Sequence, residues 1–292
     1  MRHAFVLGIG RSGTTLLGRL TALSPTPMRF ISEAFTCLSD TISPDKSDTS
    51  YVSPSDQERI RKVQNTLPNM ECGFEIFKPK MRDRIERDDS DAECMLVKEV
   101  HALLAFPQIL ANSDCRVVVI TRETSRVLDS YLQVKGNYIY LVDEHRFLAA
   151  YVSGRIAERE PIIDAALERV SPSVVRYLKR PKWMTSRLRR IVCTMEVMRH
   201  FLLAWAEQDE RVMAVQYEEL CKEPVAVMRQ VFVHLGLKCD EQTERQTLKM
   251  TSGESTEYYA TDKDSSKILN QAFRKLKQAD LKWIGDLISD HR

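Results

Sequence analysis

The chain of 292 residues is 43% hydrophobic and 8% aromatic, a globular composition with room for one large α/β domain or two small domains. Its 43 basic and 41 acidic residues leave a net charge of +2, which excludes binding of nucleic acid through overall positive charge. No run approaches the ~18 apolar residues of a membrane span. Seven cysteines without a C-x-x-C pair favour reduced thiols and a cytoplasmic location. A Golgi-lumen location is the alternative if an N-terminal anchor has been removed.

Residues 3–23 predict a strand, a tight turn and a helix. The apolar run at residues 4–7 is long enough for a buried strand, and the glycines that follow it suit only a tight turn. A helix is expected to begin at Thr14, because leucines recur at helical spacing as far as Leu23. Unpaired N–H groups and the helix dipole at such an N-terminus favour an anion.

The side chains of this turn strengthen the prediction of an anion site. Arg11 offers a forked cation that suits phosphate or sulfate, and the hydroxyl groups after it add hydrogen-bond donors. The stretch therefore predicts a cradle for a phosphorylated small molecule. The residues expected to form it are Arg11, Ser12, Gly13, Thr14 and Thr15.

Other phosphate loops compete with this interpretation. Gly8 and Gly13 have the spacing of a Walker A loop, but Thr14 stands where that loop has its Lys. The same glycines complete G-x-G-x-x-G, the dinucleotide fingerprint, and Glu33 lies where the ribose-binding acid would follow. A structural turn without a ligand is a further alternative.

The next predicted strand, residues 28–31, places Glu33 at its carboxyl end. Open parallel α/β sheets bind ligands just beyond that end of their strands, so Glu33 is a candidate for the chemistry. Its alternative role is a salt-bridged surface residue. Residues 39–56 are rich in Ser, Asp, Thr and Pro, which predicts either a mobile substrate loop or a disordered segment.

The densely charged residues 78–91 are expected to form a solvated face.

A third strand, residues 94–98, ends in Lys98 and is followed at once by Glu99 and His101. Beside the phosphate loop, Lys98 would neutralise charge on a transferring group. Its alternative is a solvent-facing strand end.

Residues 115–121 form the strongest predicted strand, because they contain a continuous β-branched run typical of the buried centre of a parallel sheet. Arg122 ends this strand where a Walker B strand would carry Asp for Mg²⁺, which favours an anion partner over a metal. A long helix is expected over residues 187–207, with its Met and Trp side chains in the core. A last strand, residues 211–216, leads to Tyr217, which either approaches a ligand or packs against the sheet.

Two motifs resemble those of sulfotransferases that use 3′-phosphoadenosine-5′-phosphosulfate (PAPS). Arg-Ser-Gly-Thr-Thr-Leu-Leu at residues 11–17 resembles their 5′-phosphosulfate loop, most closely that of the tyrosylprotein and carbohydrate branch. Arg122 and Ser130, eight residues apart, resemble the clamp for the 3′-phosphate. The segment that begins at Tyr217 and continues through Pro224 into a helix is similar to the same family.

The resemblance implies one sulfotransferase-like domain over residues 1–292, an α/β fold with a P-loop-like three-layer arrangement and a central parallel sheet flanked by helices. It implies PAPS as co-substrate, 3′-phosphoadenosine-5′-phosphate (PAP) as product, and no metal. Residues 241–268 would form a loop that closes the nucleotide site. The residues expected to bind the nucleotide are Arg11, Ser12, Gly13, Thr14, Thr15, Arg122, Ser130, Tyr217, Ser255 and Lys263.

The implied reaction is in-line transfer of a sulfuryl group to an acceptor hydroxyl, or to an amine. Glu33 is the predicted base, with its pKa raised by partial burial. Lys98 and Arg11 would supply positive charge, and His101 and Glu99 are the alternative bases. Carbohydrate, peptide tyrosine, lipid and metabolite acceptors stay open. The alternative functions are a catalytically silent nucleotide-binding protein, an NAD-type Rossmann oxidoreductase and a kinase.

Overall fold

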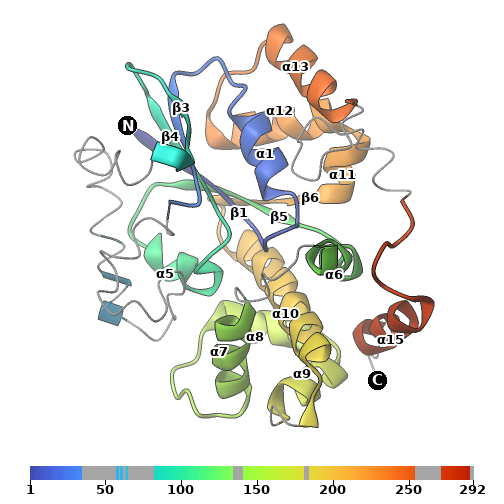
Figure 1. Ribbon diagram of the computed structural model, residues 1–292. Helices are drawn as coiled ribbons and strands as arrows, with labels where there is room; N and C mark the ends of the chain where they lie inside the picture. The colour runs from blue at the N-terminus through green and yellow to red at the C-terminus, as the bar shows by residue number, and fades with distance from the viewer. Residues whose placement is uncertain are drawn as a thin grey trace.

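Six strands form one sheet in the order β3-β2-β4-β1-β5-β6 (Figure 1). β1 pairs in parallel with β4 and β5, and β2 and β6 extend the parallel sheet on either side, which confirms the predicted central parallel sheet. The strands are β1 Arg2–Leu7, β2 Met28–Ser32, β3 Ile85–Asp88, β4 Cys94–Glu99, β5 Arg116–Thr121 and β6 Val212–Gln216.

The computed structural model describes residues 1–34, 57, 58, 60, 61, 64, 82–133, 141–180, 184–253 and 271–289. The predicted substrate loop 39–56 and two predicted nucleotide-binding residues, Ser255 and Lys263, lie outside these ranges. The helices are α1 Thr14–Thr21, α5 Phe106–Ile109, α6 Thr124–Gln133, α7 Val142–Val152, α8 Pro161–Arg169, α9 Pro172–Lys179, α10 Arg187–Gln208, α11 Tyr217–Lys222, α12 Pro224–Leu235, α13 Glu241–Thr251 and α15 Gln278–Ser289, with the 3₁₀ turns η1 Arg82–Arg84 and η2 Leu103–Ala105.

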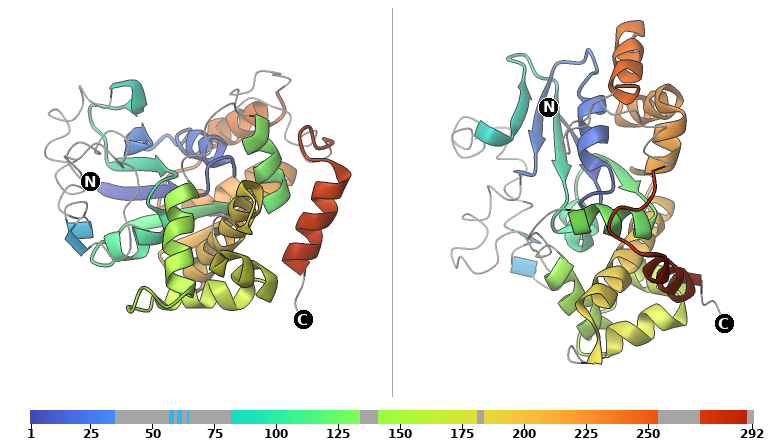
Figure 2. Two further views of the ribbon diagram at one scale, coloured as in Figure 1. Left: turned by 60° about the horizontal axis from the view of Figure 1, so that its bottom comes forward. Right: turned by 45° about the vertical axis from the view of Figure 1, so that its right-hand side comes forward.

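Two hydrophobic cores lie on opposite faces of the sheet, because successive residues of a strand point to opposite sides. In β1, Phe5 and Leu7 face a core shared with α5 and α10, whereas Ala4 and Val6 face a core shared with α1 and α12. All four side chains are buried, which explains the continuous apolar run in the sequence. Figures 1 and 2 show the helices that cover the sheet from its two sides.

The sheet differs from the prediction at one edge, where β3 runs antiparallel to β2. β3 lies within residues 78–91, for which the sequence predicts a solvated face. Its side chains alternate between half-buried and exposed, so the strand has no apolar run to reveal it. Arg87 fixes the strand by donating from Nη1 to the carbonyls of Ala22 and Ser24, each at 2.8 Å. A short, charged edge strand resists pairing with another chain.

Residues 241–251, the first part of the predicted nucleotide-closing loop 241–268, form helix α13 instead of a loop. The Asp240 carboxylate accepts a hydrogen bond from the Thr243 N–H at 2.7 Å and so caps the start of the helix. The buried face of α13 contains threonines at four-residue spacing, a pattern that apolar periodicity does not detect. These residues are Thr243, Thr247 and Thr251.

Candidate active site

The predicted site residues that the structure describes gather at the carboxyl edge of the sheet. Ser32 pairs with Lys98, so Glu33 follows its strand level with Lys98. Thr121 pairs with Gln216, so the residues after β5 and β6 are likewise neighbours. The parallel pairing therefore brings together residues that are far apart in the sequence.

The phosphate loop, residues 8–13, can be built only with glycine at two positions. A Cβ at Gly8 would lie 2.6 Å from the carbonyl oxygen of Ile120. Gly13 has a φ of 107°, and a Cβ there would lie 2.3 Å from the ring of Tyr217. The glycines thus let the loop pass close to β5 and to the start of α11, and leave room in front of α1.

Two arginines, a serine and a tyrosine form what we call the arginine cluster: Arg11, Arg122, Ser130 and Tyr217. Arg11 has a left-handed backbone, with φ at 74°, and its Nε donates to Ser130 Oγ at 3.1 Å. The Arg122 guanidinium lies 4.3 Å from the centroid of the Tyr217 ring. Burial raises the pKa of Tyr217, so its ring stays neutral and presents a π-face to the cation. The structure brings these four predicted residues together.

Arg122 also carries a polar atom suited to an anion. Its Nε is buried and has no hydrogen-bond partner among the described residues. A buried N–H is costly unless a ligand accepts from it. Ser12 differs, because its hydroxyl donates to the Ile120 carbonyl at 3.2 Å and its N–H to the Ile9 carbonyl at 3.0 Å. Ser12 therefore shapes the loop, whereas the sequence predicts it as a donor to the ligand.

A cavity of about 290 Å³ opens beside the phosphate loop. Its polar lining includes predicted residues from three strand ends, together with Arg84. Apolar residues line it as well. The lining residues are Ile9, Gly10, Arg11, Thr14, Thr15, Glu33, Arg84, Lys98, Val100, Tyr131, Leu141, Glu144 and Met198.

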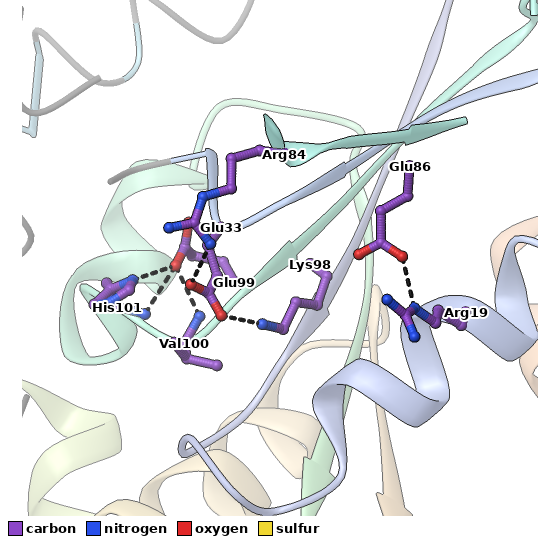
Figure 3. Close-up of polar contacts among 8 residues, drawn as sticks. All are labelled: Arg19, Glu33, Arg84, Glu86, Lys98, Glu99, Val100 and His101. Atoms are coloured by element: carbon purple, nitrogen blue, oxygen red, sulfur yellow. Dashed lines mark hydrogen bonds and ion pairs between the residues drawn. The ribbon is translucent and has the colours of Figure 1, made fainter. Parts of the chain in front are cut away.

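Glu33, which lines this cavity, lies between the two cations Lys98 and Arg84 (Figure 3). It accepts hydrogen bonds from Lys98 Nζ at 2.5 Å and from Arg84 Nη1 at 3.1 Å. Its backbone is left-handed, with φ at 57°, and its N–H donates to the Lys98 carbonyl at 2.6 Å. A non-glycine residue in this conformation costs roughly 1–2 kcal/mol, so the neighbouring contacts hold Glu33 in a specific orientation.

The predicted rise in the pKa of Glu33 is wrong. Desolvation by burial acts to raise the pKa of Glu33, as the sequence analysis expects. The charges of Lys98, His101 and Arg84, and the hydrogen bond from Lys98, outweigh it and hold the pKa of Glu33 below its ordinary value of 4.5. The carboxylate is therefore ionised at neutral pH and able to accept a proton.

The two alternative bases are buried at the turn that follows Lys98. The Glu99 carboxylate is fully buried and lies 2.6 Å from Nδ1 of His101. It also accepts from the N–H groups of Val100 at 2.8 Å and His101 at 3.1 Å. Neither Glu99 nor His101 is among the described residues that line the cavity. Their contacts instead fix the turn that follows Lys98.

Four lining residues carry no signal for the site in the sequence. Arg84 belongs to a densely charged stretch, and Met198 belongs to the apolar stripe of a long helix. Tyr131 packs against the phosphate loop, because a Cβ on Gly10 would come within 2.9 Å of its hydroxyl. Glu144 is buried at the start of α7. Tertiary structure alone brings them to the cavity.

No group of three or more His, Cys, Asp or Glu side chains in the described part of the chain could hold a metal ion. No helix there is both long and apolar enough to cross a membrane.

Residues 1–282 match the family model described as the sulfotransferase domain. Because this match spans most of the 292 residues, the chain belongs to the sulfotransferase domain family. This confirms the predicted family, and it excludes the NAD-type oxidoreductase and the kinase as alternatives. No curated protein sequence matches the chain significantly.

Solved sulfotransferases are similar at low identity. Mouse sulfotransferase SULT7A1 complexed with PAP is 12% identical, over 98% of this chain and 82% of that chain, with a TM-score of 0.46. The sulfotransferase domain from the curacin biosynthetic pathway is 15% identical, over 98% and 97%, with a TM-score of 0.43. A sulfotransferase from Alicyclobacillus acidocaldarius is 15% identical, over 85% and 90%, with a TM-score of 0.39. The family assignment rests on the family model.

Proposed function

We propose that this chain transfers a sulfuryl group from PAPS to an acceptor hydroxyl or amine, and that the arginine cluster binds the nucleotide. The buried Nε of Arg122 supports an anionic ligand, and it lies at the end of the strand next to the phosphate loop. Arg11 contacts Ser130 and also lines the cavity, so it connects the nucleotide side with the acceptor side. When bound, PAPS supplies the sulfuryl group and leaves as PAP.

Glu33 is the proposed general base. The observation that carries the proposal is its place on the cavity wall, where Lys98 and Arg84 keep its carboxylate ionised. Glu33 would take the proton from the acceptor oxygen while that oxygen forms its bond to sulfur. Its fixed backbone holds the carboxylate in one orientation, which favours in-line attack.

Lys98 would act as an electrostatic partner in the same step. Its side chain is only 3% exposed and is paired with Glu33. When Glu33 takes up a proton it loses its negative charge, and the attraction between the two side chains falls. The Lys98 cation is then available to the negative charge that develops in the transition state. Base and cation would thus be coupled through one hydrogen bond.

The tyrosylprotein and carbohydrate branch is the proposed affiliation within the family. The Arg11 loop and the Glu at the end of the next strand support it, because both resemble that branch. The cavity is lined by polar side chains together with the apolar residues Ile9, Val100 and Met198. This suits an acceptor that presents a hydroxyl from a partly apolar body.

Transfer from ³⁵S-labelled PAPS to a panel of acceptors tests the proposal. The panel contains carbohydrates, tyrosine peptides, lipids and small alcohols, and PAP is quantified in parallel. We expect one labelled product class, with PAP released in equal amount. Binding of PAP without turnover on any class would favour the catalytically silent nucleotide-binding protein. Failure to bind PAP would reject the nucleotide assignment.

A further inference from the structure

The C-terminal segment 271–276 is held by α6, the helix that carries Ser130. The segment itself forms neither helix nor strand. The buried carboxylate of Asp129 accepts hydrogen bonds from three consecutive backbone N–H groups of the segment and a fourth from Gln133 Nε2 at 3.0 Å. The three backbone donors are Arg274 at 3.1 Å, Lys275 at 2.7 Å and Leu276 at 3.0 Å.

Arg126 holds the other end of the same segment. Its Nη1 donates to the carbonyl of Gln271 at 2.5 Å, and its guanidinium lies 4.1 Å from the centroid of the Phe273 ring. Leu276 is buried in the core at the far end. Figures 1 and 2 show the chain passing α6 before it enters α15. One turn of α6 therefore determines the course of six residues.

We propose that Asp129 is a positioning residue for the donor nucleotide. It promotes nucleotide binding by fixing segment 271–276 beside Ser130. The inference rests on the proposed nucleotide role of the arginine cluster. Asp129 precedes Ser130 in the sequence, and Ser130 accepts from Arg11. The segment carries two exposed cations, Arg274 and Lys275, whose backbone N–H groups lie 3.1 Å and 2.7 Å from the carboxylate of the residue that precedes Ser130. Positive charge on this segment favours a nucleotide with two phosphate groups, since charges act over about 8 Å in physiological salt.

A carboxylate next to a phosphate site is otherwise unfavourable, because like charges repel. The charge of Asp129 is compensated by its four donors, three of which are backbone N–H groups of the segment. Helix α15 has attachments of its own. That helix buries Ile284 and Leu287, and the hydroxyl of Ser171 donates to the Leu287 carbonyl. A role limited to anchoring the C-terminus would therefore duplicate these contacts.

Asp129→Asn tests the proposal, because the amide keeps the size of the side chain but cannot accept all four hydrogen bonds. PAP binding is measured by calorimetry, and hydrogen exchange follows the N–H groups of residues 274–276. We expect faster exchange in the variant and PAP binding weakened roughly tenfold, since the nucleotide must now order the segment. The KM for PAPS should rise similarly, whereas kcat and the acceptor KM should change by less than about twofold, because the acceptor site is not altered.

Asp280→Asn is the matched control. Asp280 accepts from the N–H of Lys277 at 3.0 Å, just beyond the segment, and its loss should leave PAP binding unchanged. Arg126→Gln loosens the other end of segment 271–276 and should weaken PAP binding several-fold. This second variant keeps the test valid if Asp129→Asn fails to fold. Faster exchange with unchanged PAP binding would overturn the proposal, as would equal weakening in Asp280→Asn. If the wild-type protein does not bind PAP, the nucleotide assignment is overturned as well.

Discussion

At Glu33, neighbouring positive charges decide the charge of the proposed base. Burial alone would raise its pKa, but Lys98, His101 and Arg84 hold that pKa below 4.5. The base is therefore ionised at every pH near neutrality, and its protonation should limit the rate only in acid. We expect the acidic limb of the kcat/KM profile to lie below about pH 4.5, the ordinary value for Glu. A limb near pH 6 to 7 would instead indicate a histidine.

Glu33→Gln should separate catalysis from nucleotide binding. The amide keeps the shape of the side chain but cannot act as a carboxylate base, so turnover should fall about 10²–10⁴-fold. PAP affinity should stay normal, because Glu33 acts on the acceptor. Steady-state kinetics and calorimetry measure the two effects.

Glu86→Gln is the control for this variant. Glu86 pairs with Arg19 at 2.7 Å near the same side of the sheet, apart from the Glu33 contacts (Figure 3). Its turnover should stay near the wild-type value. Near-normal turnover in Glu33→Gln would remove Glu33 from the role, and His101→Gln and Glu99→Gln would be tested next.

Arg122 should distinguish two nucleotides that differ only in the 3′-phosphate. If Arg122 binds that phosphate, Arg122→Ala should weaken the binding of PAPS far more than the binding of adenosine-5′-phosphosulfate. A charge-assisted hydrogen bond of this kind contributes about 1.5–3 kcal/mol, or roughly 10- to 150-fold in affinity. Arg116→Ala, at the opposite end of β5, is the control and should change neither affinity. Equal weakening of both ligands by Arg122→Ala would contradict the assignment.

At the scale of elements, the phosphate loop depends on Gly13 and the helix after it. Gly13→Ala places a Cβ at 2.3 Å from the Tyr217 ring and forces alanine to a φ of 107°. The backbone alone should cost about 1–2 kcal/mol of unfolding free energy, and displacement of Tyr217 should weaken PAP further. Gly285→Ala is the control, since a Cβ there meets nothing within 4 Å inside α15. It should raise the unfolding free energy by about 0.5–1 kcal/mol. Thermal or chemical unfolding with PAP titration compares them.

The strands that the sequence predicts correctly are mostly apolar. Residues 28–31, 94–98 and 115–121 are interrupted only by Arg29, Lys98, Arg116 and Thr121, and each range forms a strand with a parallel neighbour. β3 and α13 are missed for opposite reasons. The strand alternates charged residues at an edge, and the helix buries threonines in place of apolar residues. Hydrophobic periodicity detects neither pattern.

The site is predictable only where local chemistry is distinctive. The Gly-rich loop with Arg11 indicates an anion site, and Arg122 is distinctive because it directly follows the buried strand β5. Arg84, by contrast, is one arginine among many charged neighbours, and the antiparallel pairing of β3 with β2 is what brings it to Glu33. The lowered pKa of Glu33 follows from that contact and from Lys98. Such a pKa shift depends on how close the charged side chains at neighbouring strand ends come to one another, which the sequence does not give.

At the scale of the whole molecule, a buried carboxylate connects the helix layer to the nucleotide side of the sheet. Glu196 of α10 is 2% exposed and accepts from Thr124 Oγ1, at the start of α6, at 2.5 Å. Burial alone would raise the pKa of Glu196, but hydrogen bonds from His200, Arg199 and Thr124 lower it to about 2. A carboxylate with a depressed pKa stabilises the fold above its unfolded value, and this stability is lost as the pH falls through the folded value.

Glu196→Gln should therefore destabilise the protein in a pH-dependent way. At pH 7 the loss of unfolding free energy should be on the order of 3 kcal/mol, and it should shrink between about pH 4.5 and 2, as the wild-type carboxylate becomes protonated. Urea unfolding at pH 7, 4 and 3 measures the difference. Glu207→Gln, on the exposed face of the same helix, is the control and should have little effect at any pH, because its pair with Arg169 is solvated. A difference between Glu196→Gln and wild type that stays constant with pH would mean that packing, and not the charge of Glu196, joins α10 to α6.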